Sequence, residues 1–197
     1  MPLRDTWSEV DTAGYWVIRL RDVRDETNRW AAEIARNSIE SFSGLAAPVS
    51  VNFSTVVDEN VPMAALDRED TPPQEFAARI YDAMLRYPAP IFAANLNVET
   101  IAYVCTEDSP DVPVRMPLNL GDHFRISPRY GSEETAQVSF TLEHTLFSPY
   151  NLEGDNRLLY LLNQPLLENA LRQWERAIGA ISEWIGAEGV YRYGFKA

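Results

Sequence analysis

Two histidines are the side chains of this sequence best suited to proton transfer near neutral pH, where imidazole ordinarily titrates. Each follows a carboxylate in the chain, which gives the pairs Asp122-His123 and Glu143-His144. If Asp122, His123 and His144 met in one cleft, they would form a set able to perform general acid–base chemistry or to hold a metal ion. One hypothesis is therefore a small hydrolase or isomerase that uses these three residues.

The pattern around His144 favours a structural role for it. Polar and apolar side chains alternate over residues 137–147, and His144 falls among the apolar ones. Because neighbours on a strand point to opposite faces of a sheet, we expect Glu143 in water and His144 in the core. A single histidine on an apolar face is more often a hydrogen-bonded core residue than a ligand. A structural role is also favoured for His123, which lies in a predicted loop.

Other catalytic and metal-binding motifs are missing from the sequence. It contains no glycine-rich phosphate loop, no G-x-S-x-G, no H-E-x-x-H and no calcium-binding loop. The single cysteine, Cys105, excludes an internal disulfide and a cysteine-based zinc site. Glu107 and Asp108 follow it in place of an activating base or cation, so we expect an inert buried thiol. We therefore expect no cofactor and no metal ion, and a non-enzymatic protein is favoured over an enzyme.

Acidic side chains are in strong excess. There are 29 Asp and Glu against 17 Lys and Arg in 197 residues, for a formal net charge of −12. Such a charge argues against a nucleic-acid binder, whose affinity comes mainly from cations on phosphates. The acidic residues recur in clusters, namely Asp58-Glu59, Asp67 with Glu69 and Asp70, Glu107 and Asp108 with Asp111, and Glu133-Glu134.

Three interpretations of these clusters stay open. They could form a solvated surface that keeps the protein in solution, which is the favoured interpretation. They could hold a divalent cation, which needs several oxygens at one point, but the loops show no recognised spacing. They could also form a negative docking face that steers a basic partner into place.

Aromatic residues near the two ends of the chain are candidates for contact with another protein. Trp7, Tyr191 and Tyr193 would be such anchors if they were exposed, since aromatic side chains are common in interface hot spots. The competing interpretation, which is favoured, is that they cover the edge of the core. A further hypothesis is a structural or assembly subunit that forms homo-oligomers, in which the aromatic tail adds a strand or a patch to a neighbour.

Hydrophobic periodicity predicts the elements that would position these residues. Apolar spacings of three and four residues predict helices, and alternation predicts strands. The predicted order is a strand over 15–21, a helix over 24–42, a strand over 49–57, a helix over 71–87, a hairpin over 91–106 that turns at 97–100, irregular or strand-like chain over 114–130, a strand over 137–147, two helical segments over 155–185 divided or kinked at Pro165, and a last strand over 190–196 that returns to the sheet.

This order predicts a single domain over residues 1–197, with a loose N-terminal segment over 1–13. The expected fold class is α+β, a mixed two-layer sandwich with a largely antiparallel sheet and about three helices, the longest near the C-terminus.

The leading hypothesis is a cytoplasmic, non-enzymatic protein that binds a basic partner through an acidic surface. The N-terminus lacks the pattern of a signal peptide and no apolar run is long enough for a membrane span, so we expect neither a membrane nor a nucleic-acid partner. An inhibitor or immunity-type protein that neutralises a basic enzyme has these general properties. The hypothesis requires the acidic residues to gather on one surface.

Overall fold

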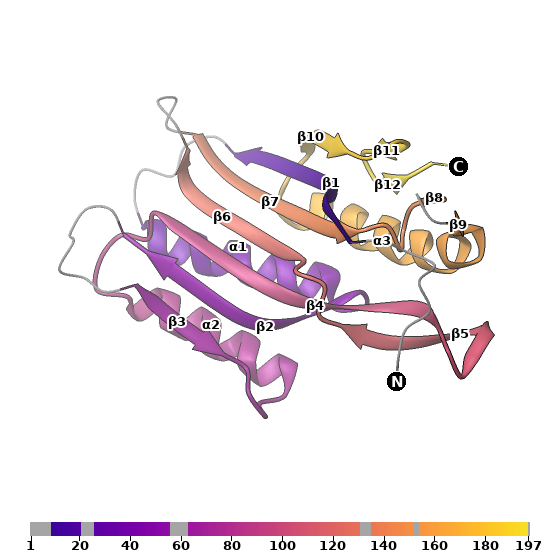
Figure 1. The fold of residues 1–197 in the computed structure, drawn as a ribbon. Helices are drawn as coiled ribbons and strands as arrows, with labels where there is room; N and C mark the ends of the chain where they lie inside the picture. The colour runs from indigo at the N-terminus through magenta and orange to yellow at the C-terminus, as the bar shows by residue number, and fades with distance from the viewer. Residues whose placement is uncertain (1–8, 21–25, 56–62, 131–134, 152–153, 197) are drawn as a thin grey trace.

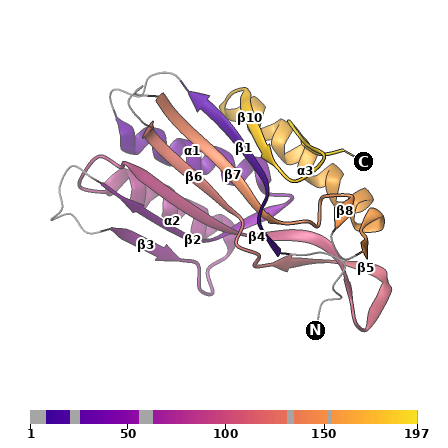
Figure 2. The same cartoon turned by 45° about the horizontal axis from the view of Figure 1, so that its top comes forward.

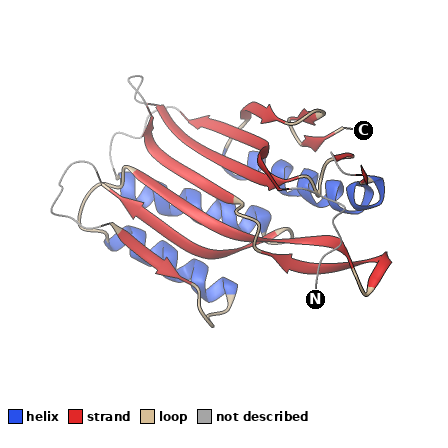
Figure 3. Ribbon diagram, in the orientation of Figure 1, coloured by secondary structure: helices blue, strands red, loops and turns tan. Residues whose placement is uncertain are grey.

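Three helices and one large, mostly antiparallel sheet make up the part of the chain that the structure describes, which confirms the predicted α+β class (Figures 1 and 3). The computed structural model describes residues 9–20, 26–55, 63–130, 135–151 and 154–196. The helices are α1 (Thr27–Phe42), α2 (Pro73–Arg86) and α3 (Arg157–Ile178). The strands of the large sheet are β1 (Glu9–Leu20), β2 (Ala46–Ser54), β3 (Ala64–Asp67), β4 (Ala93–Thr106), β5 (Ser109–Leu118), β6 (His123–Tyr130), β7 (Thr135–His144) and β10 (Ile181–Gly186). Two small pairs are β8 (Tyr150–Asn151) with β9 (Gly154–Asp155) and β11 (Val190–Tyr191) with β12 (Gly194–Phe195).

The strands of the large sheet follow the order β10-β1-β7-β6-β4-β2-β3, and β5 pairs with the later part of β4. The three helices cover one face of this sheet (Figures 1 and 2). We call the face toward the helices the inner face and the opposite one the outer face. Because every neighbouring pair is antiparallel, β3, β4, β7 and β10 run in the same direction and finish at the same end of the sheet.

The inner face is apolar because every second strand residue points toward the helices. In β4, Leu96 and Val98 are buried, whereas Asn95 and Asn97 are half-buried on the outer face. Aromatic rings then join the layers, namely Phe42 of α1, Phe124 of β6, Phe140 of β7 and Trp174 of α3. The indole N–H of Trp174 donates to Ser38 Oγ at 3.0 Å, which satisfies a polar group inside this core.

The outer face carries polar side chains in rows that cross the strands. The strand register aligns one row over seven strands, namely Asp67, Ser50, Asn97, His123, Thr141, Tyr15 and Ile185. Within this row Asn97 Nδ2 donates to Ser50 Oγ at 2.8 Å, and in the next row Asn95 Nδ2 donates to Asn52 Oδ1 at 3.3 Å. Most side chains of these rows are therefore polar, and the apolar Ile185 ends the first row at β10.

Residues 91–106 do not form the predicted hairpin, because β4 runs through them as a single strand. That prediction placed a turn at residues 97–100, but Asn97 and Glu99 lie on the half-buried outer face, between buried neighbours. Polar residues at every second position marked an exposed face rather than a turn. The hairpin turn comes later, between β4 and β5, and residues 114–130 form the end of β5 and β6.

The C-terminal region also differs from the prediction. The helix α3 continues through Pro165 but stops at Ile178, where Gly179 adopts a φ of 152° that favours glycine. Residues 181–185, predicted as helix, belong to the edge strand β10. The tail pairs with itself as β11 and β12 instead of returning to the large sheet. Among the helices of the described ranges, none has the length and hydropathy of a membrane span.

Candidate functional site

Asp122 and His144 form a hydrogen-bonded pair in the core. His144 Nε2 lies 2.9 Å from Asp122 Oδ2, and both side chains are fully buried. The Thr100 hydroxyl donates to the same oxygen, and the Glu143 backbone N–H donates to Asp122 Oδ1 at 2.9 Å. The Leu146 N–H donates to His144 Nδ1 at 3.4 Å, so in the neutral ring Nε2 carries the proton that faces Asp122.

These contacts hold Asp122 in its charged form. Burial by itself would raise the pKa of Asp122, because the core disfavours a charge. His144 opposes this through its electrostatic interaction and its hydrogen bond, and the bonds from Thr100 and Glu143 add to it, so the pKa lies below its ordinary value of 3.8. Because neither side chain reaches solvent, the pair stabilises the fold and does not contact a substrate.

His123 lies on the outer face, on the other side of the sheet from this pair. Its neighbour Phe124 is buried toward the helices, whereas His123 is half-buried among outer-face residues. The structure therefore does not bring Asp122, His123 and His144 into one cleft. Glu143 and His144 take opposite faces, as the alternation predicts.

An open pocket of about 560 Å³ surrounds His123 and is called the outer-face pocket below. Its lining comes from β1, β6, β7 and β10, namely Thr12, Tyr15, His123, Thr141, Glu143, Ile185 and Gly186. His123 Nδ1 lies 3.1 Å from the Gly121 carbonyl, which can only accept, so Nδ1 donates and Nε2 keeps its lone pair in the neutral ring. The pocket combines an imidazole acceptor, a carboxylate and hydroxyl groups.

The buried pair positions residues of this pocket. Asp122 directly precedes His123, and its backbone carbonyl accepts from the Val98 N–H at 3.0 Å. Its side chain accepts from the backbone of Glu143, as described above. Asp122 thus ties the start of β6 to β4 and to β7, and His144 holds Asp122 from the core side.

The acidic clusters that the structure describes share one end of the sheet but do not form one patch. The exposed residues at the end of β3 and in the following turn are Asp67, Glu69 and Asp70, and those of the β4–β5 hairpin are Glu107, Asp108 and Asp111. Asp67 is level with Asn97 of β4, and the hairpin turn at Glu107 lies about 30 Å further along that strand, at about 3.3 Å per residue. Asp58, Glu59, Glu133, Glu134 and Trp7 lie outside the described residues.

Tyr191 and Tyr193 make contacts within the molecule. Trp16 Nε1 donates to the Tyr191 carbonyl at 2.8 Å. The Tyr193 hydroxyl donates to Glu175, which raises the pKa of Tyr193, and the Arg172 guanidinium lies 4.0 Å from the centre of its ring. These contacts support the interpretation that the tail covers the edge of the core.

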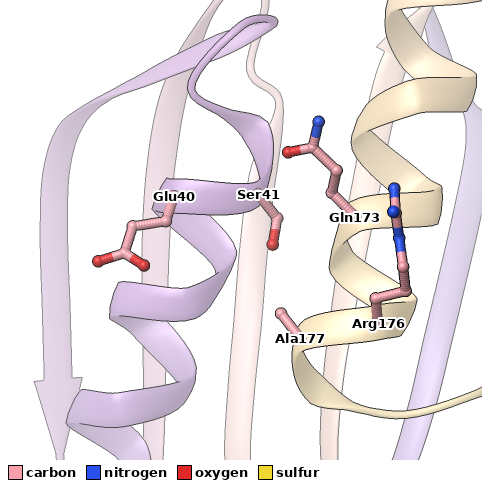
Figure 4. Close-up of a pocket in the computed structure, with 5 residues that line it drawn as sticks. All are labelled: Glu40, Ser41, Gln173, Arg176 and Ala177. Carbon is pink, nitrogen blue, oxygen red and sulfur yellow. The ribbon is translucent and has the colours of Figure 1, made fainter.

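A second pocket, of about 430 Å³, lies between α1 and α3 (Figure 4). It is lined by Glu40, Ser41, Gln173, Arg176 and Ala177. Figure 4 shows Ser41 and Ala177 facing the space between the helices, whereas Glu40 points to the other side of α1. The Glu40 carboxylate lies 3.9 Å from Arg36 Nε, and Arg176 Nε donates to the Arg172 carbonyl at 3.1 Å. The charged groups of Glu40 and Arg176 thus contact residues of their own helices and do not come together in the pocket.

Sequence reasoning identified His123 as a candidate but missed the rest of the outer-face pocket. The signal available in the sequence was alternation, which assigns Tyr15, Thr141 and Glu143 to the polar faces of their strands. These residues come together because β1 pairs with β7 and β7 pairs with β6. Periodicity along the sequence does not show which strands pair. Cys105 is buried, as predicted.

The described residues contain no group of three or more His, Cys, Asp or Glu side chains placed to hold a metal ion. Comparison of the chain with models of protein families, with curated proteins and with solved structures finds no match.

Proposed function

We propose that this protein is a non-enzymatic binding protein that accepts a basic protein partner at one end of its sheet, in the cytoplasm. We call this the acidic end. It comprises two groups about 30 Å apart along β4, Asp67, Glu69 and Asp70 in one and Glu107, Asp108 and Asp111 in the other, together with Glu143 of β7. An inhibitor or immunity-type protein that neutralises a basic enzyme would act in this way. The observation that carries the proposal is the common direction of β3, β4 and β7, whose carboxyl ends and following turns hold all of these residues except Asp111, which lies on β5.

Two arginines beside the acidic end are engaged in contacts of their own. Arg68 lies 2.7 Å from Glu99 and donates to the Pro48 carbonyl at 3.2 Å. Arg115 donates to the Gly44 carbonyl. Arg68 is thus paired with a carboxylate outside the acidic end, and the seven carboxylates of the acidic end outnumber these two cations. A surface of one sign raises the encounter rate with a partner of the opposite sign.

The β4–β5 hairpin extends beyond the neighbouring strands at this end (Figures 1 and 2). Val112 and Val114 are 65% and 40% exposed on β5, close in sequence to its acidic residues. Interfaces with proteins combine apolar contact with polar groups in this manner. The prolines of β5, Pro110, Pro113 and Pro117, lack backbone donors and so oppose pairing of this edge with a foreign strand. We therefore expect recognition through side chains.

The test measures binding of a labelled peptide of alternating arginine and serine by fluorescence anisotropy, in a series of salt concentrations. The full chain should bind this peptide with an affinity that falls about tenfold or more from low to high salt, because exposed charges are screened. Combining Glu107→Gln, Asp108→Asn and Asp111→Asn should weaken binding by a similar factor. A matched peptide with citrulline in place of arginine should not bind.

A second variant serves as the control. It also loses three negative charges, but from the helix layer, through Glu33→Gln, Glu40→Gln and Asp82→Asn. These residues are exposed on α1 and α2, away from the acidic end. The control variant should bind the arginine peptide nearly as well as the unchanged protein. Equal weakening in both triple variants would mean that only the net charge matters, and the proposed surface would be rejected.

A further inference from the structure

We infer that the outer-face pocket binds the guanidinium group of an arginine side chain that the basic partner inserts into it. This inference rests on the proposed function, since it names the chemistry of one contact at the acidic end. Glu143 belongs to both the pocket and the acidic end. The pocket is thus the part of that surface that would receive a single side chain of the partner.

The polar groups of the pocket are acceptors that suit a cation with several donors. Glu143 supplies a carboxylate, and His123 supplies Nε2, because its Nδ1 donates to the Gly121 carbonyl. The hydroxyls of Thr12 and Thr141 add oxygens that can accept. A guanidinium group carries five N–H donors in one plane and can reach several acceptors at once, whereas an ammonium group acts as a compact point charge.

The remaining walls suit the aliphatic part of an arginine side chain. Ile185 is 56% exposed and lines the pocket from β10, and Tyr15 lines it from β1. The Tyr15 hydroxyl accepts a hydrogen bond from Gln137 Nε2 at 3.3 Å, which fixes the ring against the outer face. Long cationic side chains pack their methylene groups on such apolar surfaces while the charge meets polar groups.

The pocket is built into the sheet and does not depend on a loop for its shape. Its residues belong to four neighbouring strands, and Asp122 and His144 secure the two that carry His123 and Glu143. At its rim β10 approaches β1 so closely that a Cβ atom on Gly186 would collide with the Ala13 carbonyl. A preformed site loses less conformational freedom when a ligand binds.

The test titrates the ¹⁵N-labelled full chain with N-acetyl-L-arginine methylamide and follows backbone amide shifts by NMR. Saturable shifts should centre on Gly121, Thr141 and Gly186, and the neutral isostere N-acetyl-L-citrulline methylamide should cause none of them. Glu143→Gln should weaken binding of the arginine probe about tenfold or more, because it removes a charge-assisted contact. This change leaves the backbone N–H that donates to Asp122 in place, and an otherwise unchanged spectrum reports an intact fold.

Two further variants make the test specific. His123→Asn should weaken binding of the probe. Arg125 is the next residue of β6 that points to the outer face, and it lies outside the pocket, so Arg125→Gln should not weaken binding. Any of three results would overturn the inference: the citrulline probe binds as tightly as the arginine probe, the shifts centre elsewhere, or Glu143→Gln leaves the affinity unchanged.

The pocket and the proposed function can fail separately. If the arginine probe binds in the pocket but binding of the arginine–serine peptide does not depend on the hairpin, the pocket inference stands and the proposed function fails. If that peptide depends on the hairpin but not on Glu143, the proposed function stands and the pocket inference fails.

Discussion

Asp122 and His144 are residue types that often perform catalysis, yet here their environment gives them a structural role. A buried charge is tolerated only when it is paired and hydrogen-bonded, since desolvation is costly. The carboxylate of Asp122 meets this condition with a hydroxyl, a backbone N–H and an imidazole. Removal of either partner leaves a polar group in the core without compensation.

We predict that Asp122→Asn lowers the free energy of unfolding by about 3 kcal/mol, because it leaves His144 without its charged partner. Urea unfolding followed by tryptophan fluorescence measures this change. His123→Asn, on the outer face, serves as the surface control and should alter stability by no more than about 0.5 kcal/mol. An Asp122→Asn protein as stable as the original would show that the pair contributes little.

The pH dependence of stability tests the charge state of Asp122. Its pKa in the folded protein is below the ordinary value, so the folded state binds its proton less tightly than the unfolded chain does. The contribution of Asp122 to stability is therefore fully present above about pH 4 and is lost as the pH falls through the lowered pKa. The difference in unfolding free energy between the original protein and Asp122→Asn should shrink from about pH 5 toward pH 2. A constant difference over this range would contradict a charged Asp122.

At the scale of elements, Asn163 of α3 takes the place of a strand beside β4. The register of β2 begins at Ala46, level with Thr100, so the later part of β4 extends past it on that side. There Asn163 Oδ1 accepts from the Tyr103 N–H at 2.7 Å, and its Nδ2 donates to the Tyr103 carbonyl at 2.9 Å. One amide side chain thus completes the hydrogen bonds of this edge and attaches α3 to the sheet.

We predict that Asn163→Ala lowers the free energy of unfolding by about 2 kcal/mol, because it leaves two backbone groups of Tyr103 without their partner. Thermal or urea unfolding measures the effect. Asn169→Ala, an exposed asparagine on the same helix, should change stability by less than about 0.5 kcal/mol. If the two substitutions changed the free energy of unfolding equally, the change would be due to helix propensity and not to the loss of the contact with Tyr103.

The elements that the sequence predicts well are those whose periodicity is strong and local. The strand β7, predicted over 137–147 and observed over Thr135–His144, and the helix that ends at Phe42 follow from one amphipathic pattern each. The strand over 181–186 was predicted as helix because Ile178, Ile181 and Ile185 continue a helical spacing. The conformation of Gly179 breaks that pattern, and pairing with β1 then decides the structure.

The candidate site was harder to predict than the fold because it depends on pairing between distant strands. Local alternation placed His144 inside and Glu143 outside, and both assignments are confirmed. Local alternation could not predict that Tyr15, Thr141 and His123 lie side by side on three neighbouring strands. The grouping of acidic loops at one end likewise follows from strand direction, which composition does not contain.

At the scale of the whole molecule, the structure divides charge between the two layers. Many of the acidic residues on the helices are paired with arginines of the same helix, as in Glu40 with Arg36, Asp82 with Arg86 and Glu168 with Arg172. Exposed pairs of this kind contribute little to stability. The arginines nevertheless balance the carboxylates in number, since α1 and α2 each carry two acidic and two basic residues. The carboxylates at the acidic end are thereby the more prominent negative feature for an approaching partner.

The C-terminal tail gives a prediction about assembly. Phe195 is buried against Trp16, with ring centres 6.0 Å apart, and Gln164 donates to the Tyr193 carbonyl and accepts from the Phe195 N–H. Because these groups already have partners in their own chain, we expect the tail to stabilise the fold and not to join copies of it. Phe195→Ala should lower the free energy of unfolding by about 3 kcal/mol or more, since it leaves a cavity beside Trp16.

Mass measurement by light scattering, on the full chain and on a chain that lacks residues 190–197, separates these two roles. The mass per particle should correspond to the same number of copies in both proteins, while the shortened protein unfolds at a lower denaturant concentration. Tyr191→Phe, which keeps the ring and the backbone carbonyl that accepts from Trp16, should change neither property appreciably. A full chain that is a dimer and a shortened chain that is a folded monomer would assign the tail to an interface between copies.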